Sequence, residues 1–396
     1  MTRAPLLVPD GRGLHCAEGG FWIDPWRPVE RAVLTHAHGD HARPGSAAYL
    51  AAAPGLDLLR HRLPKARIEG VPYGESRRVG EVDLSFHPAG HVLGSAQVRI
   101  EHRGEVWVVS GDYKRQADPT CAPFEPVRCH TFITEATFAL PIYRWTETAA
   151  VAAQVAAWWR ENAEAGRASV LCAYSLGKAQ RLLAALAPHV EGRTIRTHGA
   201  IEDINEIYRR SGVQLPPTRR IDPQSSGSFA GDLMIAPPAA FGSLWMRRIG
   251  RAQSGFASGW MLLPDRVRRS SFDRGFVVSD HADWGDLLRT IEETGAERVL
   301  TTHGYAAALA RFLAERGGEA GMLETKVGRE SSERAESSAQ LRLPLPERPV
   351  AVEAREVAGV ASWLFDECCE VVGNFAETVA LLAQAGGKRG RPEEPC

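Results

Sequence analysis

The chain has 396 residues, which is enough for two modest domains or for one large domain with an insertion. Its hydrophobic content of 44% and charged content of 24% are ordinary for a soluble globular protein. The net charge of −1 excludes a global electrostatic attraction to nucleic acid, so any such binding requires local basic patches.

The cysteines and the N-terminal stretch predict the compartment. The seven cysteines form no C-x-x-C pair and no even disulfide framework, so we expect free thiols in a reducing cytosol. Residues 1–10 lack the features of a secretory signal, and the Ala-rich stretch 149–159 is interrupted by Gln154 and too short to span a bilayer. We therefore expect a cytoplasmic protein that does not contact a membrane.

The first predicted strand covers residues 21–24 and ends in a carboxylate. Asp24 is either a turn residue or a hydrogen-bond partner that orients metal ligands further along the chain. After the next strand, residues 43–53 have helical composition and are followed by Pro54 and Gly55, which predicts a helix that ends there.

The densest group of metal-binding side chains lies between these two elements. A buried strand ends at Leu34, and the turn after it holds three imidazoles and one carboxylate within six residues: His36, His38, Asp40 and His41. Residues i and i+2 at a strand end point the same way, so the first two can hold one ion together. Gly39 permits a bend that turns the other two toward a second ion. Neutral imidazole and carboxylate suit zinc and similar divalent metals.

Ligand-type residues also follow the next predicted strands. These strands cover residues 81–87, 97–101, 106–110 and 131–135. His91 follows the first of them, Asp112 follows the third, and Glu135 ends the fourth. Functional groups on loops at strand ends are common in layered α/β sheets. A single residue of this kind would more often be structural, but the repetition in one topological place favours a functional role.

Residues 144–270 differ in character and predict a second α/β unit. The expected elements are a helix over 147–163, a strand over 169–174, a helix over 179–186 and strands over 232–236 and 256–263. A strand, a glycine turn and a helix N-terminus form a natural phosphate cradle, which makes Ser175, Gly177 and Lys178 candidate phosphate-binding residues. The pattern is generic, because many α/β turns have it without binding anything.

Arginines gather in the second half of this unit: Arg219, Arg220, Arg247, Arg248, Arg251, Arg266, Arg268 and Arg269. They form either a nucleic-acid groove or an ordinary solvated surface. Arg247 and Arg248 are the candidates that we select for contacts with nucleic acid.

The strand-then-histidine arrangement returns after this interval. A strand over 275–280 is followed by His281, and a strand over 298–302 is followed by His303. The second unit is therefore predicted to be inserted into a first domain made of residues 1–143 and 271–326. The remaining segments are a linker over 327–350, an amphipathic helical tail over 351–386 and a disordered end over 387–396.

Seven of these residues suffice for a two-metal site. We expect one ion to be held by His36, His38 and His91, the other by Asp40, His41 and His303, and both by a bridging Asp112. Two ions roughly 3.5–4 Å apart can share a hydroxide as nucleophile and clamp both oxygens of an in-line phosphoryl displacement. The predicted catalytic residues are Asp40, Asp112, His281 as the acid for the leaving group, and Glu135 as the residue that orients it. The spacing predicts a dinuclear hydrolase without choosing phosphate over an ester or amide.

Several motifs together resemble one nuclease family. The segment 36–41, His91 in Pro-Ala-Gly-His and Asp112 in Ser-Gly-Asp-Tyr resemble motifs of the metallo-β-lactamase fold, and more specifically of its β-CASP nuclease branch. That branch includes RNase J, the pre-mRNA 3′-end endonuclease and Artemis. The segments around Glu135, His281 and His303 look like its three additional motifs. Residues 174–180 look like a segment of its inserted cap domain, and the resemblance spans residues from about 10 to about 320.

The resemblance implies an α/β fold, namely an αββα metallo-β-lactamase sandwich with an inserted α/β β-CASP cap and a helical C-terminal tail. It implies two divalent ions, zinc with manganese as the alternative, and hydrolysis of phosphodiester bonds. Within the branch the sequence is most similar to bacterial ligase-associated DNA exonucleases. That likeness implies processing of DNA ends in repair, together with an ATP-dependent DNA ligase and an Lhr-type helicase. Residues 363–382 look like part of the helical N-terminal domain of such ligases.

Two alternatives stay open. A histidine at the position of His303 is commoner in the RNA-processing members of the family, which favours an RNA-processing enzyme with the same site. The second alternative is a non-catalytic subunit that recruits a DNA ligase and whose metal site is structural. The intact ligand set argues against it, because a non-catalytic relative would be free to lose ligands.

Overall fold

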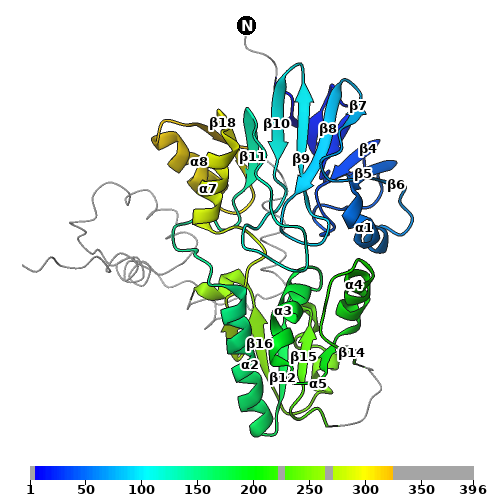
Figure 1. Cartoon of the computed structure of the whole chain (residues 1–396), viewed down its shortest axis with the longest axis vertical. Helices are drawn as coiled ribbons and strands as arrows, with labels where there is room; N and C mark the ends of the chain where they lie inside the picture. Colours follow the sequence, from blue (N-terminus) through cyan, green and yellow to red (C-terminus); the bar gives the residue numbers. More distant parts are fainter. Residues whose placement is uncertain (1–4, 222–227, 264–270, 324–396) are drawn as a thin grey trace, which may run out of the picture.

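The computed structural model describes residues 5–221, 228–263 and 271–323, which form three β-sheets with helices packed against them (Figure 1). The predicted linker, helical tail and disordered end, residues 327–396, lie outside the described residues. The mixed α/β class predicted from the sequence is confirmed.

The first sheet has six strands in the order β1-β2-β3-β4-β5-β6. Their bounds are β1 Val8–Pro9, β2 Leu14–Cys16, β3 Phe21–Ile23, β4 Arg31–Leu34, β5 Ala48–Ala52 and β6 Ile68–Val71. The pairs β1–β2 and β2–β3 are antiparallel, and the strands from β3 to β6 run parallel to one another.

The second sheet has seven strands in the order β19-β18-β11-β10-β9-β8-β7. Their bounds are β7 Arg77–Val79, β8 Val82–Pro88, β9 Ala96–His102, β10 Glu105–Val109, β11 Thr131–Glu135, β18 Arg298–Thr302 and β19 Glu319–Met322. The strands β8, β10, β11 and β18 run in one direction, so their carboxyl ends meet at one edge. Because β11 pairs with β18, the chain returns to this sheet after a long excursion.

The two sheets pack face to face around one apolar core. Phe21 and Val33 of the first sheet and Phe86, Val98 and Trp107 of the second are at most 1% exposed within it. Burial of a large apolar side chain contributes roughly 1.5–3 kcal/mol, so this interface is a principal source of stability.

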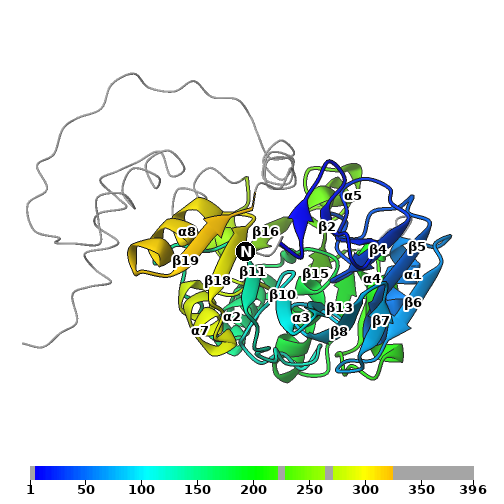
Figure 2. The same ribbon diagram turned by 90° about the horizontal axis from the view of Figure 1, so that it is seen from above.

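Helices cover both outer faces of this sandwich. The helix α1, Leu56–Arg62, packs Leu58 and Leu59 on the first sheet. The helices α7, Trp284–Thr294, and α8, Ala306–Glu315, cover the second sheet. Seen from above, α1 and α8 lie on opposite sides of the molecule (Figure 2). The layers are therefore helix, sheet, sheet and helix.

The third sheet is entirely parallel, with six strands in the order β14-β13-β15-β12-β16-β17. The strand bounds are β12 Ala168–Cys172, β13 Ile195–Thr197, β14 Thr218–Arg220, β15 Leu233–Ala236, β16 Ala252–Ala257 and β17 Arg274–Phe276. Its helices are α2 Thr148–Glu164, α3 Lys178–Leu186, α4 Gly199–Arg210 and α5 Leu244–Arg247. We call this part of the chain the inserted unit.

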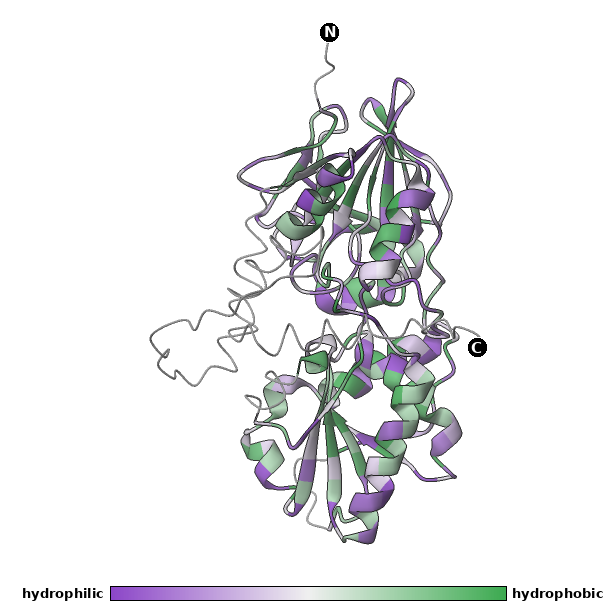
Figure 3. Ribbon diagram, turned by 90° about the vertical axis from the view of Figure 1, so that its left-hand side faces the viewer, coloured by the Kyte–Doolittle hydropathy of each residue, from purple (hydrophilic) through white to green (hydrophobic). Residues whose placement is uncertain are grey.

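The central strands of the inserted unit are buried on both faces. Every residue of β12 and β15 is buried, as expected for a parallel sheet covered on two sides. Figure 3 shows apolar residues gathered where helices face these strands and hydrophilic residues on the outer helix surfaces. The helix α4 also packs Ile204, Ile207 and Tyr208 into the cluster beneath α1, so the inserted unit is docked on the sandwich.

Three predictions of local structure are wrong. The segment predicted as a helix over 43–53 contains β5, because Ala48–Ala52 pairs with β4 and β6 and is largely buried between them. The strand predicted over 256–263 ends at Ala257 and gives way to the 3-10 helix Gly259–Leu262. The strand predicted over 275–280 is confined to Arg274–Phe276. The other predicted strands and helices agree to within two residues at each end.

Two further observations concern the cysteines and the length of the helices. Four cysteines within the described residues are free thiols, namely Cys16, Cys121, Cys129 and Cys172. In the same part of the chain, no helix is both long and apolar enough to cross a membrane.

Candidate metal centre

The predicted ligands meet at one edge of the sandwich. Four of the elements that carry them are loops that leave the carboxyl ends of β4, β8, β10 and β18. Since β8, β10 and β18 run in the same direction, the residues after them emerge side by side. The register of β11 with β18 sets Glu135 opposite Thr302, which brings His303 to the same edge. The repeated strand-end pattern in the sequence thus corresponds to one place in the fold.

Three imidazoles converge on one point. The Nδ1 atom of His38 lies 2.9 Å from Nε2 of His36 and 3.1 Å from Nε2 of His91. Together with a carboxylate oxygen of Asp112, the ligand atoms lie within 4.8 Å of one another, which makes this a group that could hold a metal ion. We call His36, His38 and His91 the three-histidine group.

Burial keeps these imidazoles neutral. His36 and His91 are 2% and 1% exposed. Burial, assisted by the neighbouring His41, lowers the pKa of His36 well below its ordinary value. Burial, assisted by His281, does the same to the pKa of His91. A neutral imidazole with a free lone pair is the form that binds a divalent metal.

Asp112 lies between this group and the second set of predicted ligands. Its Oδ2 atom is 3.5 Å from Nε2 of His36, 3.5 Å from Nε2 of His41 and 3.7 Å from Nε2 of His91. One carboxylate oxygen thus faces ligands of both predicted ions, which is the placement that a bridging ligand requires.

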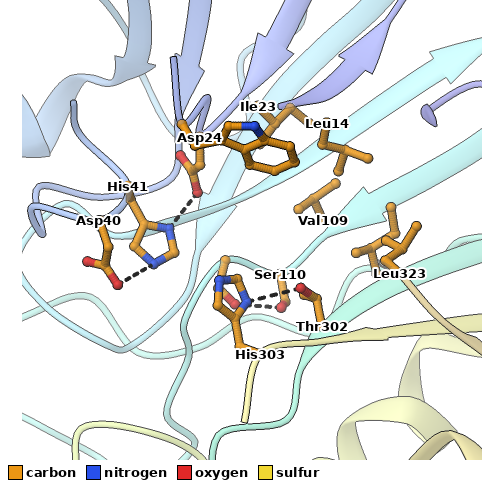
Figure 4. Close-up of a pocket in the computed structure, with 13 residues that line it drawn as sticks. Leu14, Ile23, Asp24, Asp40, His41, Val109, Ser110, Thr302, His303 and Leu323 are labelled. Carbon is orange, nitrogen blue, oxygen red and sulfur yellow. Dashed lines mark hydrogen bonds and ion pairs between the residues drawn. The ribbon is translucent and has the colours of Figure 1, made fainter. Parts of the chain in front are cut away.

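The second set is gathered less tightly. Oδ2 of Asp40 is 3.7 Å from Nε2 of His41, and the ring of His303 stacks on that of His41 with 5.8 Å between centroids. Figure 4 shows Asp40 and His41 on one side of a pocket and His303 facing them. Among the described residues, the other group of ligand atoms within 4.8 Å consists of Asp112, Glu135 and His281. The Asp40 side chain is 40% exposed, so it is free to adjust when a cation is present.

The electrostatics around His41 favour positive charge. Burial would lower the pKa of His41, but the carboxylates of Asp112, Asp40 and Asp24 outweigh it and raise that pKa well above the ordinary value. A buried position that stabilises a proton against desolvation also attracts a metal cation, which would replace that proton.

Asp24 is placed as a hydrogen-bond partner of the site. Its Oδ2 accepts a hydrogen bond from Nδ1 of His41 at 2.7 Å, and its Oδ1 accepts one from the backbone N–H of Thr35 at 2.8 Å. The bond at Nδ1 leaves Nε2 of His41 to face Asp112. Asp24 and His303 both adopt left-handed backbone conformations, with φ of 41° and 63°. Such strain in residues other than glycine is concentrated at functional sites.

His281 and Glu135 form a buried pair beside the ligands. Nδ1 of His281 donates a hydrogen bond of 2.8 Å to Oε2 of Glu135, whose Oε1 accepts one from the backbone N–H of Tyr113 at 2.7 Å. Burial opposes protonation, but the negative charges of Glu135 and Asp112 prevail and raise the pKa of His281 to about 9. This histidine therefore carries a proton at neutral pH, as a general acid must.

The predicted phosphate-binding residues are not grouped in one place. Lys178 is buried, with its Nζ 3.5 Å from a carboxylate oxygen of Asp280, and the N–H of Gly177 donates to Oε1 of Gln180 at 2.8 Å. Ser175 is partly exposed beside them. Arg247 and Arg248 are exposed at the carboxyl end of α5.

A group of buried charges lies behind His91, and of its members only Lys178 was a candidate from the sequence. It consists of Lys114, Asp118, Lys178, Arg181 and Asp280. Their side chains are almost fully buried, although the backbone of Asp118 is partly exposed. Burial, together with Arg181, lowers the pKa of Lys114 to about 7. These residues come from three separate segments of the chain, so no local motif could have identified the group.

A pocket opens beside the second set of ligands. Asp24, Asp40, His41 and His303 form its polar wall. The opposite wall is apolar and is made by Leu14, Ile23, Val109, Ile133 and Leu323 (Figure 4).

Similar sequences are found among nucleases and in one ligase, while no family model matches the chain. A probable DNA ligase of Opitutus terrae is 34% identical over 320 residues, which cover 80% of this chain and 31% of the ligase. An RNase J-like protein of Methanocaldococcus jannaschii is 23% identical over 213 residues, or 46% of this chain and 50% of that protein. Cleavage and polyadenylation specificity factor 73 of Drosophila melanogaster is 30% identical over 128 residues, or 30% of this chain and 17% of the factor. This chain thus spans half or less of the length of each of these relatives.

Proposed function

We propose that this chain is a metal-dependent nuclease of the β-CASP branch of the metallo-β-lactamase fold, and that it hydrolyses phosphodiester bonds of DNA. The observation that carries this proposal is the convergence of the three-histidine group and Asp112 within 4.8 Å at one edge of a two-sheet sandwich. The similarity to an RNase J-like protein and to cleavage and polyadenylation specificity factor 73, both β-CASP nucleases, supports it. In this proposal the inserted unit is the β-CASP cap.

The donor set fits two divalent ions. His36, His38 and His91 would hold one, Asp40, His41 and His303 the other, and Asp112 would bridge them, in keeping with its position between His36 and His41. When bound, zinc or manganese ions would provide the Lewis acidity that activates water and neutralises charge on a phosphate.

The residues around the ligands direct the chemistry. Asp24 holds the ring of His41 through Nδ1, so that Nε2 points into the site. His281 would donate the proton that the leaving oxygen needs, from the ring nitrogen that Glu135 does not contact. Glu135 keeps this imidazole both charged and fixed in orientation, because its other oxygen is tied to the backbone at Tyr113.

The choice of DNA rests on the ligase relative. That protein is named a DNA ligase, and a region covering about a third of it is similar to 80% of this chain. A single polypeptide that joins both sequences supports a shared pathway, in which this chain trims DNA ends as an exonuclease before ligation. Partnership with an ATP-dependent DNA ligase and an Lhr-type helicase belongs to the same proposal through the resemblance of the motifs.

RNA is the second candidate substrate. It is favoured by His303, which stacks against His41 at the edge of the site, and by the RNase J-like relative. The same residues would act on the same type of bond, so only the choice of nucleic acid differs.

Parallel digestion of labelled substrates tests the proposal. The purified full chain is incubated with zinc or manganese and with 5′- or 3′-labelled single-stranded DNA, double-stranded DNA and RNA. We expect nucleotides to be released from DNA ends, and His281→Ala to slow this by about 10²-fold or more, as loss of a general acid does. Degradation of RNA with DNA left intact would replace DNA by RNA, and intact DNA and RNA with metal-loaded protein would favour the recruitment subunit.

A further inference from the structure

One loop of the inserted unit touches the three-histidine group directly. The loop of residues 174–177 joins β12 to α3, and the carbonyl oxygen of Leu176 lies 3.1 Å from Nε2 of His38. A carbonyl can only accept a hydrogen bond, so Nε2 carries the proton and Nδ1 keeps its lone pair. That Nδ1 is the atom that faces His36 and His91. The contact therefore sets both the tautomer and the orientation of His38.

The loop approaches the sandwich as closely as glycine permits. Gly177 has φ of +88°, and a Cβ atom at this position would lie 2.3 Å from Cγ1 of Val92, the residue after His91. Its N–H donates to Oε1 of Gln180, which fixes the start of α3. A side chain at residue 177 therefore collides with Val92, and either Val92 or the loop that carries the Leu176 carbonyl must shift.

The helix α3 holds His91, a second member of the three-histidine group, in place. Nη2 of Arg181 donates to the carbonyl oxygen of His91 at 3.0 Å and pairs with Oδ2 of Asp118 at 2.9 Å. Lys178 and Arg181 both lie 3.5 Å from the carboxylate of Asp280. The backbone carbonyl of Asp280 in turn accepts the hydrogen bond of His91 Nδ1 at 2.9 Å. The backbone and ring of His91 are thus both held through α3.

We propose that the loop 174–177 and α3 are positioning elements of the metal centre, so that ion binding by the three-histidine group depends on docking of the inserted unit. This inference rests on the proposed metal site and adds an asymmetry to it. In the set of Asp40, His41 and His303, the ring of His41 is oriented by Asp24, which belongs to the sandwich itself. Disturbing the loop should weaken one ion and leave the other in place.

Two alanine substitutions, made at glycines with nearly the same φ, test this. Gly177→Ala is compared with Gly212→Ala in the full chain, because the two glycines have φ of 88° and 89°, but a Cβ atom at residue 212 meets nothing within 4 Å. Zinc content is measured after dialysis, and affinities by competition with a chromogenic chelator. We expect Gly177→Ala to bind one of two ions about 10- to 100-fold more weakly, the usual effect of losing an outer partner of a ligand. Gly212→Ala should bind both as the parent does.

A rescue variant separates this effect from misfolding. Val92→Ala removes the Cγ1 atom that the new side chain would strike, so Gly177→Ala combined with Val92→Ala should regain most of the affinity relative to Val92→Ala alone. Two ions bound by Gly177→Ala with affinities within about twofold of Gly212→Ala would overturn the inference alone, as would equal weakening of both ions. A parent protein that binds no metal would instead overturn the proposed function, and the inference with it.

Discussion

Replacement of Arg181 by methionine should destabilise the protein by about 3 kcal/mol. The guanidinium is 2% exposed and reaches Asp118, Asp280 and the His91 carbonyl, so its loss leaves a buried carboxylate at Asp118 without its closest cation. Removal of one partner of a buried pair costs roughly 3–5 kcal/mol. We expect the lower end of that range, because Lys178 stays beside Asp280 and Thr120 still donates to Asp118.

Urea unfolding of the metal-free parent and variant at pH 7 measures this difference. Arg181→Lys is the matched control, since it keeps the charge but has one donor group where the guanidinium has several, and it should fall between the two. A loss below about 1 kcal/mol, the value of an exposed pair, would refute the reasoning that these charges act as a buried network.

The contact of Arg181 with Asp280 predicts how this difference in stability depends on pH. Burial would raise the pKa of Asp280, but Lys178 and Arg181 hold it at about 2. A carboxyl group with a depressed pKa stabilises the fold above its unfolded pKa, near 3.8, and this stabilisation is lost as the pH falls through about 2. The difference in the free energy of unfolding between the parent and Arg181→Met should therefore shrink as the pH falls from about 4 to about 2.

Three further predictions concern the site itself. Glu135→Gln should move the alkaline limb of the pH profile of kcat/KM to lower pH, because the carboxylate that does most to raise the pKa of His281 is gone. An alkaline limb at the same pH in parent and variant would exclude this histidine as the acid. Asp112→Asn should reduce both the metal content and the rate, the latter by about 10²-fold or more, and retention of two tightly bound ions would remove the residue from its bridging role. Dialysis against a chelator should lower the melting temperature, because a ligand at 100 times its Kd stabilises a fold by about 2.7 kcal/mol; readdition of zinc should restore it, and an unchanged melting temperature would argue against a resident metal.

The metal-binding edge could be predicted from the sequence because its signal is local. His36, His38, Asp40 and His41 share one turn, and His91 and Asp112 each follow a recognisable strand. The strand β5 could not be predicted in the same way, because an alanine-rich segment suits a helix until parallel neighbours bury it on both sides. The residue pattern of a segment predicts its secondary structure only in part, and for a segment that suits both helix and strand the pairing with neighbouring strands decides.

The surroundings of the site were beyond the reach of sequence patterns for a different reason. The partner of His38 is a backbone carbonyl 138 residues away, and a carbonyl is present at every residue regardless of its side chain. Arg181 lies on a helix whose pattern gives no indication that its guanidinium enters a buried network with Asp118 and Asp280. Such contacts exist only because the inserted unit docks where it does.

The point of insertion explains why docking and chemistry are linked. The chain leaves the second sheet after Glu135, at the metal-binding edge, and returns to that edge at His281 before α7 and β18. Trp145, on the outgoing connection, donates from its ring to the carbonyl oxygen of His281 at 2.9 Å and from its backbone to Asp283 at 2.9 Å. The two connections are therefore held to each other beside the pair of His281 and Glu135. A displacement of the inserted unit would pull on His281 as well as on His38, so the proposed proton donor and the three-histidine group would be disturbed by the same motion.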